Sequence, residues 1–257
     1  MRESAIHPDW LRPDWDAPGV GALMTTRAGG VSEAPFASMN LRFEVGDDPD
    51  AVAANRAILA ATCGASPVWL DQVHGARVVR LRAAHRPSAP ADASVTTEPG
   101  IACAVQVADC LPVLFAADAA RAVGAAHAGW RGLAGGVLEA TLAAVCEAAG
   151  CVPAQVQAWL GACIGPDHFE VGADVLAAFD IAADPARARR FTPTVPGKWL
   201  ADLPGLARDR LRAAGVERIG GGSWCTYAET SRFFSYRRDR VTGRMAAAVW
   251  LAPGSGR

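Results

Sequence analysis

The sequence predicts an α+β protein built on mixed sheets. Apolar runs typical of strands stand before and after helical periodicities, without the regular strand-helix-strand cadence that is typical of a parallel α/β fold. A tight hairpin pattern lies near the middle of the chain, and no internal repeat or low-complexity tract is present. The 257 residues are 51% apolar, which is enough to bury a full core. Because no break in composition separates two units, we expect residues 1–257 to form a single domain.

The N-terminal half is expected to contain one helix between strands. Asp48 and Pro49 suit the N-cap and the first turn of this helix, and Gly64 suits its end. We expect strands at residues 20–27, 68–72 and 76–82, and a surface loop rich in Ala and Pro at residues 83–100. The second and third strands flank a Val73-His74-Gly75 turn. His74 is therefore at a junction from which side chains commonly reach sites, although a surface histidine is the simpler interpretation.

The C-terminal half follows the same periodicities. We expect strands at residues 101–107, 111–117, 122–126 and 156–160, helices at 133–149 and 203–214, an irregular loop at 180–201, and a final hairpin of 233–238 with 244–251. Gly150 and Gly215 suit the ends of the two helices. In the final hairpin, several side chains could stack on a flat base or bind phosphate: Phe233, Phe234, Tyr236, Arg237 and Arg238. Ordinary aromatic residues at a sheet edge explain this segment equally well.

The central hairpin is predicted to bring a cysteine opposite a histidine. If its turn is the two-residue loop Asp118-Ala119, facing residues have numbers that sum to 237, so Cys110 faces His127. Directly opposed residues have Cβ atoms about 4.5–5.5 Å apart. A thiolate and an imidazole at that separation can share one metal ion, with bonds of about 2.3 and 2.0 Å. The alternative is a buried core thiol near an ordinary strand-end histidine.

A glycine-rich turn follows His127 directly. Gly129-Trp130-Arg131-Gly132 stands between a strand and a helix start, an order that favours an anion site because the first helical N–H groups have no internal partner. Arg131 would add a fixed charge beside the N–H groups from Gly132 onward. The glycine spacing does not match the dinucleotide-binding pattern, so we exclude a Rossmann site. A helix packed closely on a sheet is the alternative interpretation.

Composition excludes several classes of function. A formal net charge of −1 argues against nucleic acid or an anionic membrane as the main partner. The polar N-terminus has no signal region, and no window of about 18 apolar residues exists, so we expect a cytoplasmic protein. Seven cysteines without a C-x-x-C pair suit a reducing compartment and exclude a ribbon-type zinc site. The single lysine, Lys198, gives little support to Schiff-base chemistry.

Motifs spread along the chain closely resemble those of the YfiH/YlmD family. They are Asn40-Leu41, Val45-Gly46-Asp47, Asn55-Arg56, Gln72-Val73-His74-Gly75, Ala108-Asp109-Cys110-Leu111-Pro112-Val113, Ala126-His127-Ala128-Gly129-Trp130-Arg131-Gly132, Ile164-Gly165, Phe169-Glu170-Val171-Gly172, Cys225-Thr226 and residues 233–238. The family has been called multicopper polyphenol oxidase or laccase, peptidoglycan editing factor and purine nucleoside phosphorylase. One departure is Phe43-Glu44, where the family often has a histidine.

The resemblance implies a four-layer α/β/β/α sandwich similar to cytotoxic necrotising factor. It also implies a zinc site on His74, Cys110 and His127, with copper as the alternative metal. His74 as third ligand comes from the resemblance alone. Three protein ligands leave one coordination position open, which is typical of a catalytic zinc. Asp109, next to Cys110, is expected to support the catalytic ligands.

The family also implies an activity and a set of substrate contacts. The activity is zinc-dependent purine nucleoside phosphorolysis of adenosine, inosine or S-methyl-5′-thioadenosine to a free purine and a ribose 1-phosphate, with adenosine deaminase activity. The expected partners are a small nucleoside and inorganic phosphate, with no nucleic acid and no membrane; the oligomeric state is not predicted. The candidate substrate-binding residues are Arg56, Arg131, Gly132 and Arg237.

Three other classes of function remain as alternatives. Two histidines and a cysteine are also a blue-copper ligand set, so the chain could be a copper-dependent polyphenol oxidase, although its five histidines are too few for a full laccase. It could also be a cysteine hydrolase that edits peptidoglycan precursors, with Cys110 as nucleophile and His127 as base. The third alternative is a metal-binding regulator without turnover.

Overall fold

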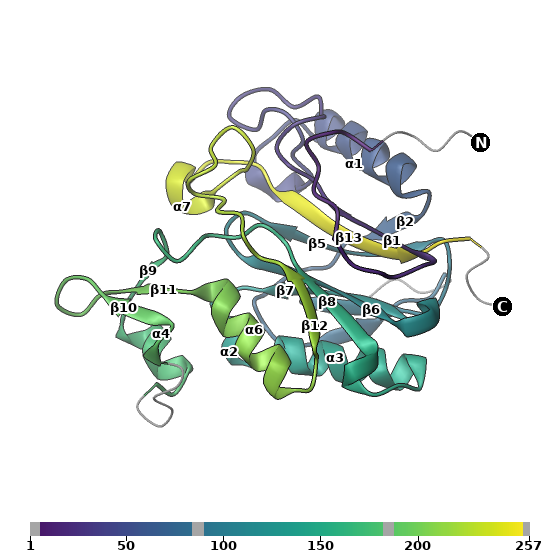
Figure 1. The fold of residues 1–257 in the computed structure, drawn as a ribbon. Helices are drawn as coiled ribbons and strands as arrows, with labels where there is room; N and C mark the ends of the chain where they lie inside the picture. The colour runs from purple at the N-terminus through teal and green to yellow at the C-terminus, as the bar shows by residue number, and fades with distance from the viewer. Residues whose placement is uncertain (1–5, 84–89, 182–187, 254–257) are drawn as a thin grey trace.

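A computed structural model describes residues 6–83, 90–181 and 188–253, and these residues form three sheets (Figure 1). The four-stranded sheet has the order β1 (Val20–Met24), β13 (Met245–Leu251), β5 (Ile101–Val107), β2 (Ser66–Val68). The six-stranded sheet has the order β12 (Arg218–Gly221), β8 (Val156–Leu160), β6 (Leu111–Ala117), β7 (Val123–Ala128), β4 (Ala93–Thr96), β3 (Val78–Arg80). The small sheet has the order β10 (Phe191–Pro193), β11 (Trp199–Ala201), β9 (Glu170–Val171). Both larger sheets mix parallel and antiparallel pairs, which confirms the predicted α+β class with mixed sheets.

Helices cover the outer faces of the two larger sheets (Figure 1). The helices are α1 (Pro49–Cys63), α2 (Trp130–Ala134), α3 (Val137–Ala149), α4 (Ala173–Ala178), α6 (Leu203–Ala213) and α7 (Tyr236–Asp239), with 3-10 turns η1 (Phe43–Val45), η2 (Asp118–Ala120) and η3 (Pro153–Gln155). The predicted limits of α1 are confirmed: the Asp48 side chain accepts the N–H of Asp50 at 3.0 Å, and Gly64 ends the helix in the left-handed conformation. None of the described helices is long and apolar enough to cross a membrane.

The core consists of three layers of buried side chains. One cluster lies between α1 and the four-stranded sheet, one lies between the two larger sheets, and one lies between the six-stranded sheet and the helices α3 and α6. Strand β5 contributes to two of them, because alternate side chains point to opposite faces: Ala104 packs on the α1 side and Val105 packs toward the other sheet. Every residue of β5 is therefore buried.

The predicted register of the central hairpin is wrong by two residues. Pro112, not Cys110, is paired with His127, and facing residues have numbers that sum to 239. The physical reason lies in the turn, which is longer than two residues: Ala117 donates its N–H to Ala122, and Ala119 and Ala120 adopt positive φ. Cys110 precedes β6 and reaches His127 from the turn instead of from a paired strand position.

Five other local predictions differ from the structure. The predicted strand at residues 68–72 overlaps β2 at Val68 alone, since residues 69–72 are not in a strand. The predicted loop at residues 83–100 contains strand β4, residues 84–89 lying outside the described part, and the predicted irregular loop at 180–201 contains β10 and β11. The predicted helix after His127 is two helices, since Gly136 with φ of 90° separates α2 from α3. The predicted C-terminal hairpin is also wrong. Its first arm contains the short helix α7, and β13 pairs with β1 and β5.

Candidate metal centre and substrate pocket

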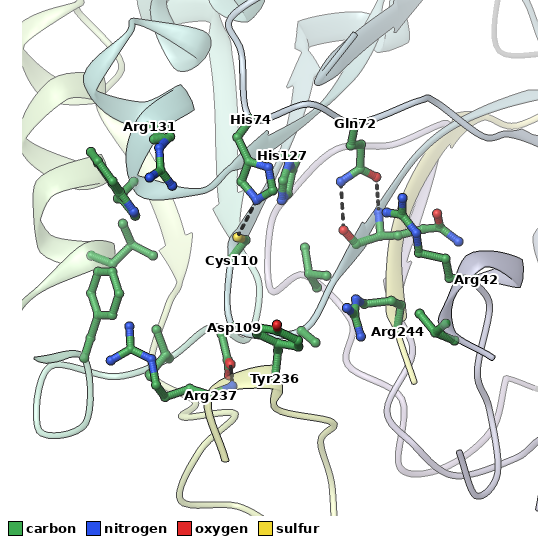
Figure 2. Close-up of a pocket in the computed structure, with 18 of the residues that line it drawn as sticks. Arg42, Gln72, His74, Asp109, Cys110, His127, Arg131, Tyr236, Arg237 and Arg244 are labelled. Carbon is green, nitrogen blue, oxygen red and sulfur yellow. Dashed lines mark hydrogen bonds between the residues drawn. The ribbon is translucent and has the colours of Figure 1, made fainter. Parts of the chain in front are cut away.

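Three side chains from separate segments converge at one end of the six-stranded sheet. The ligand atoms of His74, Cys110 and His127 all lie within 4.8 Å of one another, and this is the single such group of three among the residues described. Cys110 Sγ lies 3.7 Å from His74 Nε2, and the two imidazole rings meet edge to face with centroids 4.8 Å apart. Figure 2 shows His74 and Cys110 pointing toward each other. The three predicted ligands are thus brought together.

The distance between the sulfur of Cys110 and the nitrogen of His74 fits two ligands of one tetrahedral metal ion. With zinc–sulfur and zinc–nitrogen bonds of about 2.3 and 2.0 Å, a tetrahedral angle puts sulfur and nitrogen about 3.5 Å apart. The separation of 3.7 Å between Cys110 and His74 is close to that value. His127 has its Nδ1 engaged by Asp92 at 2.8 Å, which leaves Nε2 free to coordinate. One thiol and two imidazoles suit zinc and also copper.

Asp92 supports two of the three ligands. Its carboxylate accepts the backbone N–H groups of Val73, His74 and Gly75 at 3.2, 2.9 and 2.7 Å, in addition to Nδ1 of His127. His74 adopts a positive φ of 61°, a conformation that costs free energy for a residue with a side chain. The three amide hydrogen bonds stabilise that turn. Asp92 therefore holds His74 and His127 in place at the same time.

The carboxyl of Asp92 is fully buried and still ionised. Burial alone would raise the pKa of Asp92, but hydrogen bonds from His127 and from the Gly75 amide outweigh burial and lower the pKa below its usual value. In addition, the backbone carbonyl of Asp92 accepts the backbone N–H of His127 at 2.7 Å. Sequence reasoning missed this residue because it lies in the Ala/Pro-rich segment that was expected to be a surface loop.

The surroundings of Cys110 favour the thiolate that a metal site uses, whereas those of His127 favour an imidazolium, which must lose its proton before Nε2 can coordinate. Burial raises the pKa of the Cys110 thiol, but the imidazoles of His127 and His74 outweigh burial and lower the pKa to about 6. Burial lowers the pKa of His127, whereas the Cys110 thiolate and the Asp92 carboxylate raise it to about 9. In the metal-free protein the pair is thus a thiolate beside an imidazolium.

Two glycines of the turn after β7 leave space for this cluster. A Cβ on Gly129 would lie 2.8 Å from His74 Cδ2 and 3.0 Å from Cys110 Sγ, so a side chain there would enter the ligand cluster. A Cβ on Gly132 would lie 2.8 Å from the Gly75 carbonyl oxygen. The close approach lets α2 pack on the turn that carries His74 and places Arg131 beside the cluster.

Asp109 does not support the ligands in the way that was expected. Its carboxylate accepts the hydroxyl of Thr226 at 2.7 Å and the backbone N–H of Arg237 at 2.6 Å. Asp109 thereby joins the turn before Cys110 to the C-terminal segment that begins α7. Its φ of 88° belongs to the left-handed region, where the two hydrogen bonds hold it. The residue lines the pocket, but the hydrogen-bond partners of its carboxylate are Thr226 and Arg237 and not the three ligands.

The three ligands line a pocket of about 590 Å³ that is rich in arginine (Figure 2). Its lining consists of Arg42, Glu44, Val45, Gln72, His74, Gln106, Val107, Ala108, Asp109, Cys110, His127, Trp130, Arg131, Ile164, Phe169, Leu203, Tyr236, Arg237, Arg240 and Arg244. Two arginines stack on aromatic rings there: Arg131 lies 4.2 Å from the Trp130 ring centroid, and Arg237 lies 5.4 Å from that of Phe169. The pocket thus combines positive charge with flat apolar surfaces.

Only some of the predicted substrate-binding residues line the pocket. Arg131 and Arg237 line the pocket, and Gly132 is buried directly behind Arg131. Arg56 is not part of the lining. Its Nε donates to the carbonyl of Leu41 at 2.8 Å, and its guanidinium stacks between the rings of Phe43 and Trp69. Arg56 therefore supports the wall of the pocket from outside.

Several pocket residues could not be singled out from the sequence. They are Arg42, Gln106, Arg240 and Arg244, with Gln72 known only as part of a motif; Tyr236, in contrast, belongs to the set of aromatic and arginine residues that the sequence predicted could stack on a base. Gln72 and Gln106 exchange hydrogen bonds: Gln72 Nε2 donates to the Gln106 carbonyl at 2.9 Å, and the Gln106 N–H donates to Gln72 Oε1 at 2.8 Å. The one available signal was the accumulation of arginines after residue 236, which was interpreted as part of a hairpin.

Known proteins match this chain over nearly its whole length. Residues 21–252 match the model of the family described as multi-copper polyphenol oxidoreductase laccase. Purine nucleoside phosphorylase YfiH of Escherichia coli is 50% identical over 248 residues, which cover 96% of this chain and 98% of that protein. Purine nucleoside phosphorylase of Pseudomonas aeruginosa is 49% identical over 243 residues, which cover 94% of this chain and 98% of that protein.

Solved structures agree with these relatives. The structure of YlmD from Geobacillus stearothermophilus has a TM-score of 0.88 and 34% identity and covers 97% of this chain and 98% of its own. A Neisseria meningitidis protein structure has a TM-score of 0.89 and 48% identity and covers 95% of this chain and 99% of its own. The chain therefore belongs to the YfiH/YlmD family, whose matching family model is that of the multi-copper polyphenol oxidoreductase laccases.

Proposed function

We propose that this protein is a zinc-dependent purine nucleoside phosphorylase. The observation that carries the proposal is that three possible metal ligands lie together inside a pocket lined by several arginines and aromatic rings. Three protein ligands leave a coordination position for a substrate group. Curated relatives that are about half identical to this chain are named purine nucleoside phosphorylase, and this name implies a nucleoside and inorganic phosphate as substrates.

The side chains of the pocket suggest a division of tasks. Asp92 fixes the orientation of His127 and the turn of His74, so both imidazoles are held ready for the metal. When bound, the metal would supply a Lewis acid that polarises an oxygen of the substrate. Trp130 and Phe169 offer flat surfaces for a purine base. Arg131, at the start of α2 and next to the cluster, is proposed to bind inorganic phosphate together with the N–H of Gly132, because the next N–H, that of Leu133, already donates to the Gly129 carbonyl at 2.8 Å.

Incubation of metal-defined protein with a panel of nucleosides tests this proposal. Adenosine, inosine and S-methyl-5′-thioadenosine should each yield a free purine and the matching ribose 1-phosphate, and only when phosphate is present. Equal base release in phosphate-free buffer would indicate hydrolysis instead. Conversion of adenosine to inosine in the same reactions would reveal the adenosine deaminase activity that we propose as a second activity of this site.

Two alternatives have a specific observation in their favour. The donor set of one thiolate and two imidazoles also suits a mononuclear copper ion, which would make a copper-dependent oxidation of phenols measurable in copper-loaded protein. The low pKa of the Cys110 thiol, caused by the imidazoles that outweigh its burial, suits a cysteine hydrolase that edits peptidoglycan precursors. Covalent trapping of Cys110 by a substrate-like electrophile in metal-free protein would favour the hydrolase.

We also propose that the layers form the four-layer α/β/β/α sandwich expected from the family, similar to cytotoxic necrotising factor. The three stacked core clusters and the helices on both outer faces support this arrangement (Figure 1). Superposition of an experimental structure on cytotoxic necrotising factor would test it.

A further inference from the structure

A second group of cations lies across the pocket from Arg131. Figure 2 shows Arg42 and Arg244 on one side of His74 and Cys110, and Arg131 on the other side. All three arginines line the same pocket. Phosphorolysis, as proposed above, consumes one inorganic phosphate, and the ribose 1-phosphate that it yields carries that same phosphoryl group. The second group of cations therefore has no ligand in the proposed reaction.

One buried amide positions both of these arginines. Asn40 is fully buried, and its Oδ1 accepts the backbone N–H of Arg42 at 3.1 Å and that of Arg244 at 2.9 Å. The Nδ2 of Asn40 donates to the Arg42 carbonyl at 3.0 Å and to Asp47 at 2.8 Å. Two segments from opposite ends of the chain are thus joined at one side chain. The joint brings the backbones of both arginines together at the same side of the pocket.

The charge of this pair is only partly compensated. The guanidinium of Arg244 donates from Nη1 to the carbonyls of Thr242 and Gly243 at 2.8 and 3.1 Å, and no carboxylate of the described residues forms an ion pair with it. Arg42 Nε lies 3.2 Å from Glu44, whose side chain is 70% exposed, so water screens that pair. Burial and the neighbouring Arg42 lower the pKa of Arg244 below its usual value. A bound anion would offset both the burial of the Arg244 guanidinium and its repulsion from Arg42.

Further donors surround the pair. The guanidinium carbons of Arg240 and Arg244 each lie 5.6 Å from the ring centroid of Tyr236, which is 47% exposed. Arginine binds phosphoryl groups through two parallel N–H donors, and two arginines on the same side of a pocket match the double negative charge of a phosphate monoester. The chemistry that this wall recognises is therefore a phosphoryl group.

We propose that Arg42 and Arg244 form a second phosphoryl subsite, with which the pocket accepts purine nucleoside 5′-monophosphates. The 5′-phosphate lies on these two arginines, opposite the inorganic phosphate at Arg131. The assignment of purine and ribose to the rest of the pocket rests on the proposed function. The volume of about 590 Å³ is within the range of small-molecule sites and leaves room for a nucleotide.

Calorimetric titration in phosphate-free buffer tests the subsite without turnover. The two ligands to be compared are inosine 5′-monophosphate and inosine, since the base of both has no amino group and cannot be deaminated. The wild-type protein should bind the monophosphate at least about 10-fold more tightly than inosine, because a hydrogen bond to a charged group corresponds to about 10- to 150-fold in affinity. In Arg244→Gln and in Arg42→Gln the affinity ratio should fall toward one. Arg212→Gln, on the exposed surface of α6, is the matched control.

Two results would overturn the subsite. One is equal affinity of the wild type for the monophosphate and for inosine. The other is an unchanged affinity ratio in Arg244→Gln together with a raised phosphate KM, which would assign Arg244 to the free inorganic phosphate. Selective binding of the monophosphate through Arg244, with no phosphorolysis of any nucleoside, would support the subsite and contradict the proposed reaction. The failure of the phosphoryl subsite can thus be distinguished from the failure of the proposed phosphorylase reaction.

Discussion

Asp92 Oδ1 lies 2.8 Å from His127 Nδ1, and the same buried carboxylate accepts the backbone N–H of His74. One residue therefore connects two segments that carry metal ligands. The link is indirect, since Asp92 itself is not within the ligand group. Partners of this kind fix the orientation of ligating imidazoles and contribute to metal affinity.

The change Asp92→Asn should weaken zinc binding by about 10- to 100-fold. The amide replaces one acceptor oxygen by an NH2 group, which would face the donors of the His74 turn or of His127. Competition with a chelator of known affinity measures the effect. Asp71→Asn, an exposed carboxylate in the neighbouring segment, is the control. Equal zinc affinities of Asp92→Asn and wild type would show that Asp92 does not support the ligands.

Cys110→Ala should remove both bound zinc and turnover while the protein remains folded. The thiolate is one of three ligands, and the small cavity left by its loss lies at a pocket and not in the core. Metal analysis, activity and thermal unfolding are the measurements. Cys146→Ala, a half-buried cysteine on α3, should retain the metal. Full zinc stoichiometry in Cys110→Ala would refute the ligand assignment.

Gly129→Ala should lose metal where Gly75→Ala keeps it. The added Cβ at position 129 would meet His74 and Cys110 at 2.8 and 3.0 Å, whereas the one at position 75 would find its nearest neighbour, Asp92, at an ordinary 3.5 Å. Gly129 has a φ of −63°, so the alanine introduces no backbone strain. Zinc content of the two purified variants is the measurement. Equal metal contents would contradict the crowding argument.

Arg131→Ala should raise the phosphate KM about 10- to 150-fold, because this is the factor that corresponds to the loss of one hydrogen bond to a charged group. The kcat should change little. Deamination needs no phosphate and should be nearly unaffected. Steady-state kinetics with varied phosphate is the measurement. If Arg131 instead holds the turn through its stacking on Trp130, both activities and the thermal stability should fall together. A parallel loss of that kind would exclude the phosphate role.

Asp209 should contribute stability that disappears in acid. Hydrogen bonds from Arg190, at 2.7 and 2.8 Å, lower the pKa of Asp209 below its usual value. Because the folded-state pKa is the lower one, the contribution is complete above the unfolded pKa of about 3.9 and is lost as the pH falls through the folded pKa. The unfolding free energy of Asp209→Asn should be about 1 kcal/mol below wild type at neutral pH, and the gap should close in acid. A constant gap would contradict this; Asp167→Asn, an exposed control, should show none.

The sequence was sufficient for elements with strong local signals. The capped start of α1 at Asp48 and the buried strands β5 and β6 are determined by nearby residues, and the structure has them where the patterns predict. His74, Cys110 and His127 were also identified before the structure, two from hairpin geometry and one from the family resemblance. Cys110 and His127 lie close together as predicted, but they are not paired across the hairpin. The predicted register is wrong because the turn at Ala119 and Ala120 is wider than the two residues assumed.

The remaining parts of the site depend on long-range contacts that no local pattern reveals. Asp92 lies in a segment whose composition is typical of a surface loop, and it becomes a strand neighbour only when β4 pairs with β7. Arg42 and Arg244 are far apart in the sequence, and their backbones are joined in the fold by the hydrogen bonds that both donate to Asn40. Tertiary contacts of this kind outweigh local composition, which is why the arginine wall was missed.

The X-ray absorption spectrum of the metal in the purified protein tests the central claim most directly. If His74, Cys110 and His127 hold one ion, the absorption edge identifies that metal, and for zinc the fine structure should contain one sulfur at about 2.3 Å and imidazole nitrogens at about 2.0 Å. The sulfur shell should vanish in Cys110→Ala. A spectrum of the wild type with only nitrogen and oxygen neighbours would contradict the account, because the Cys110 thiolate would then not be a ligand.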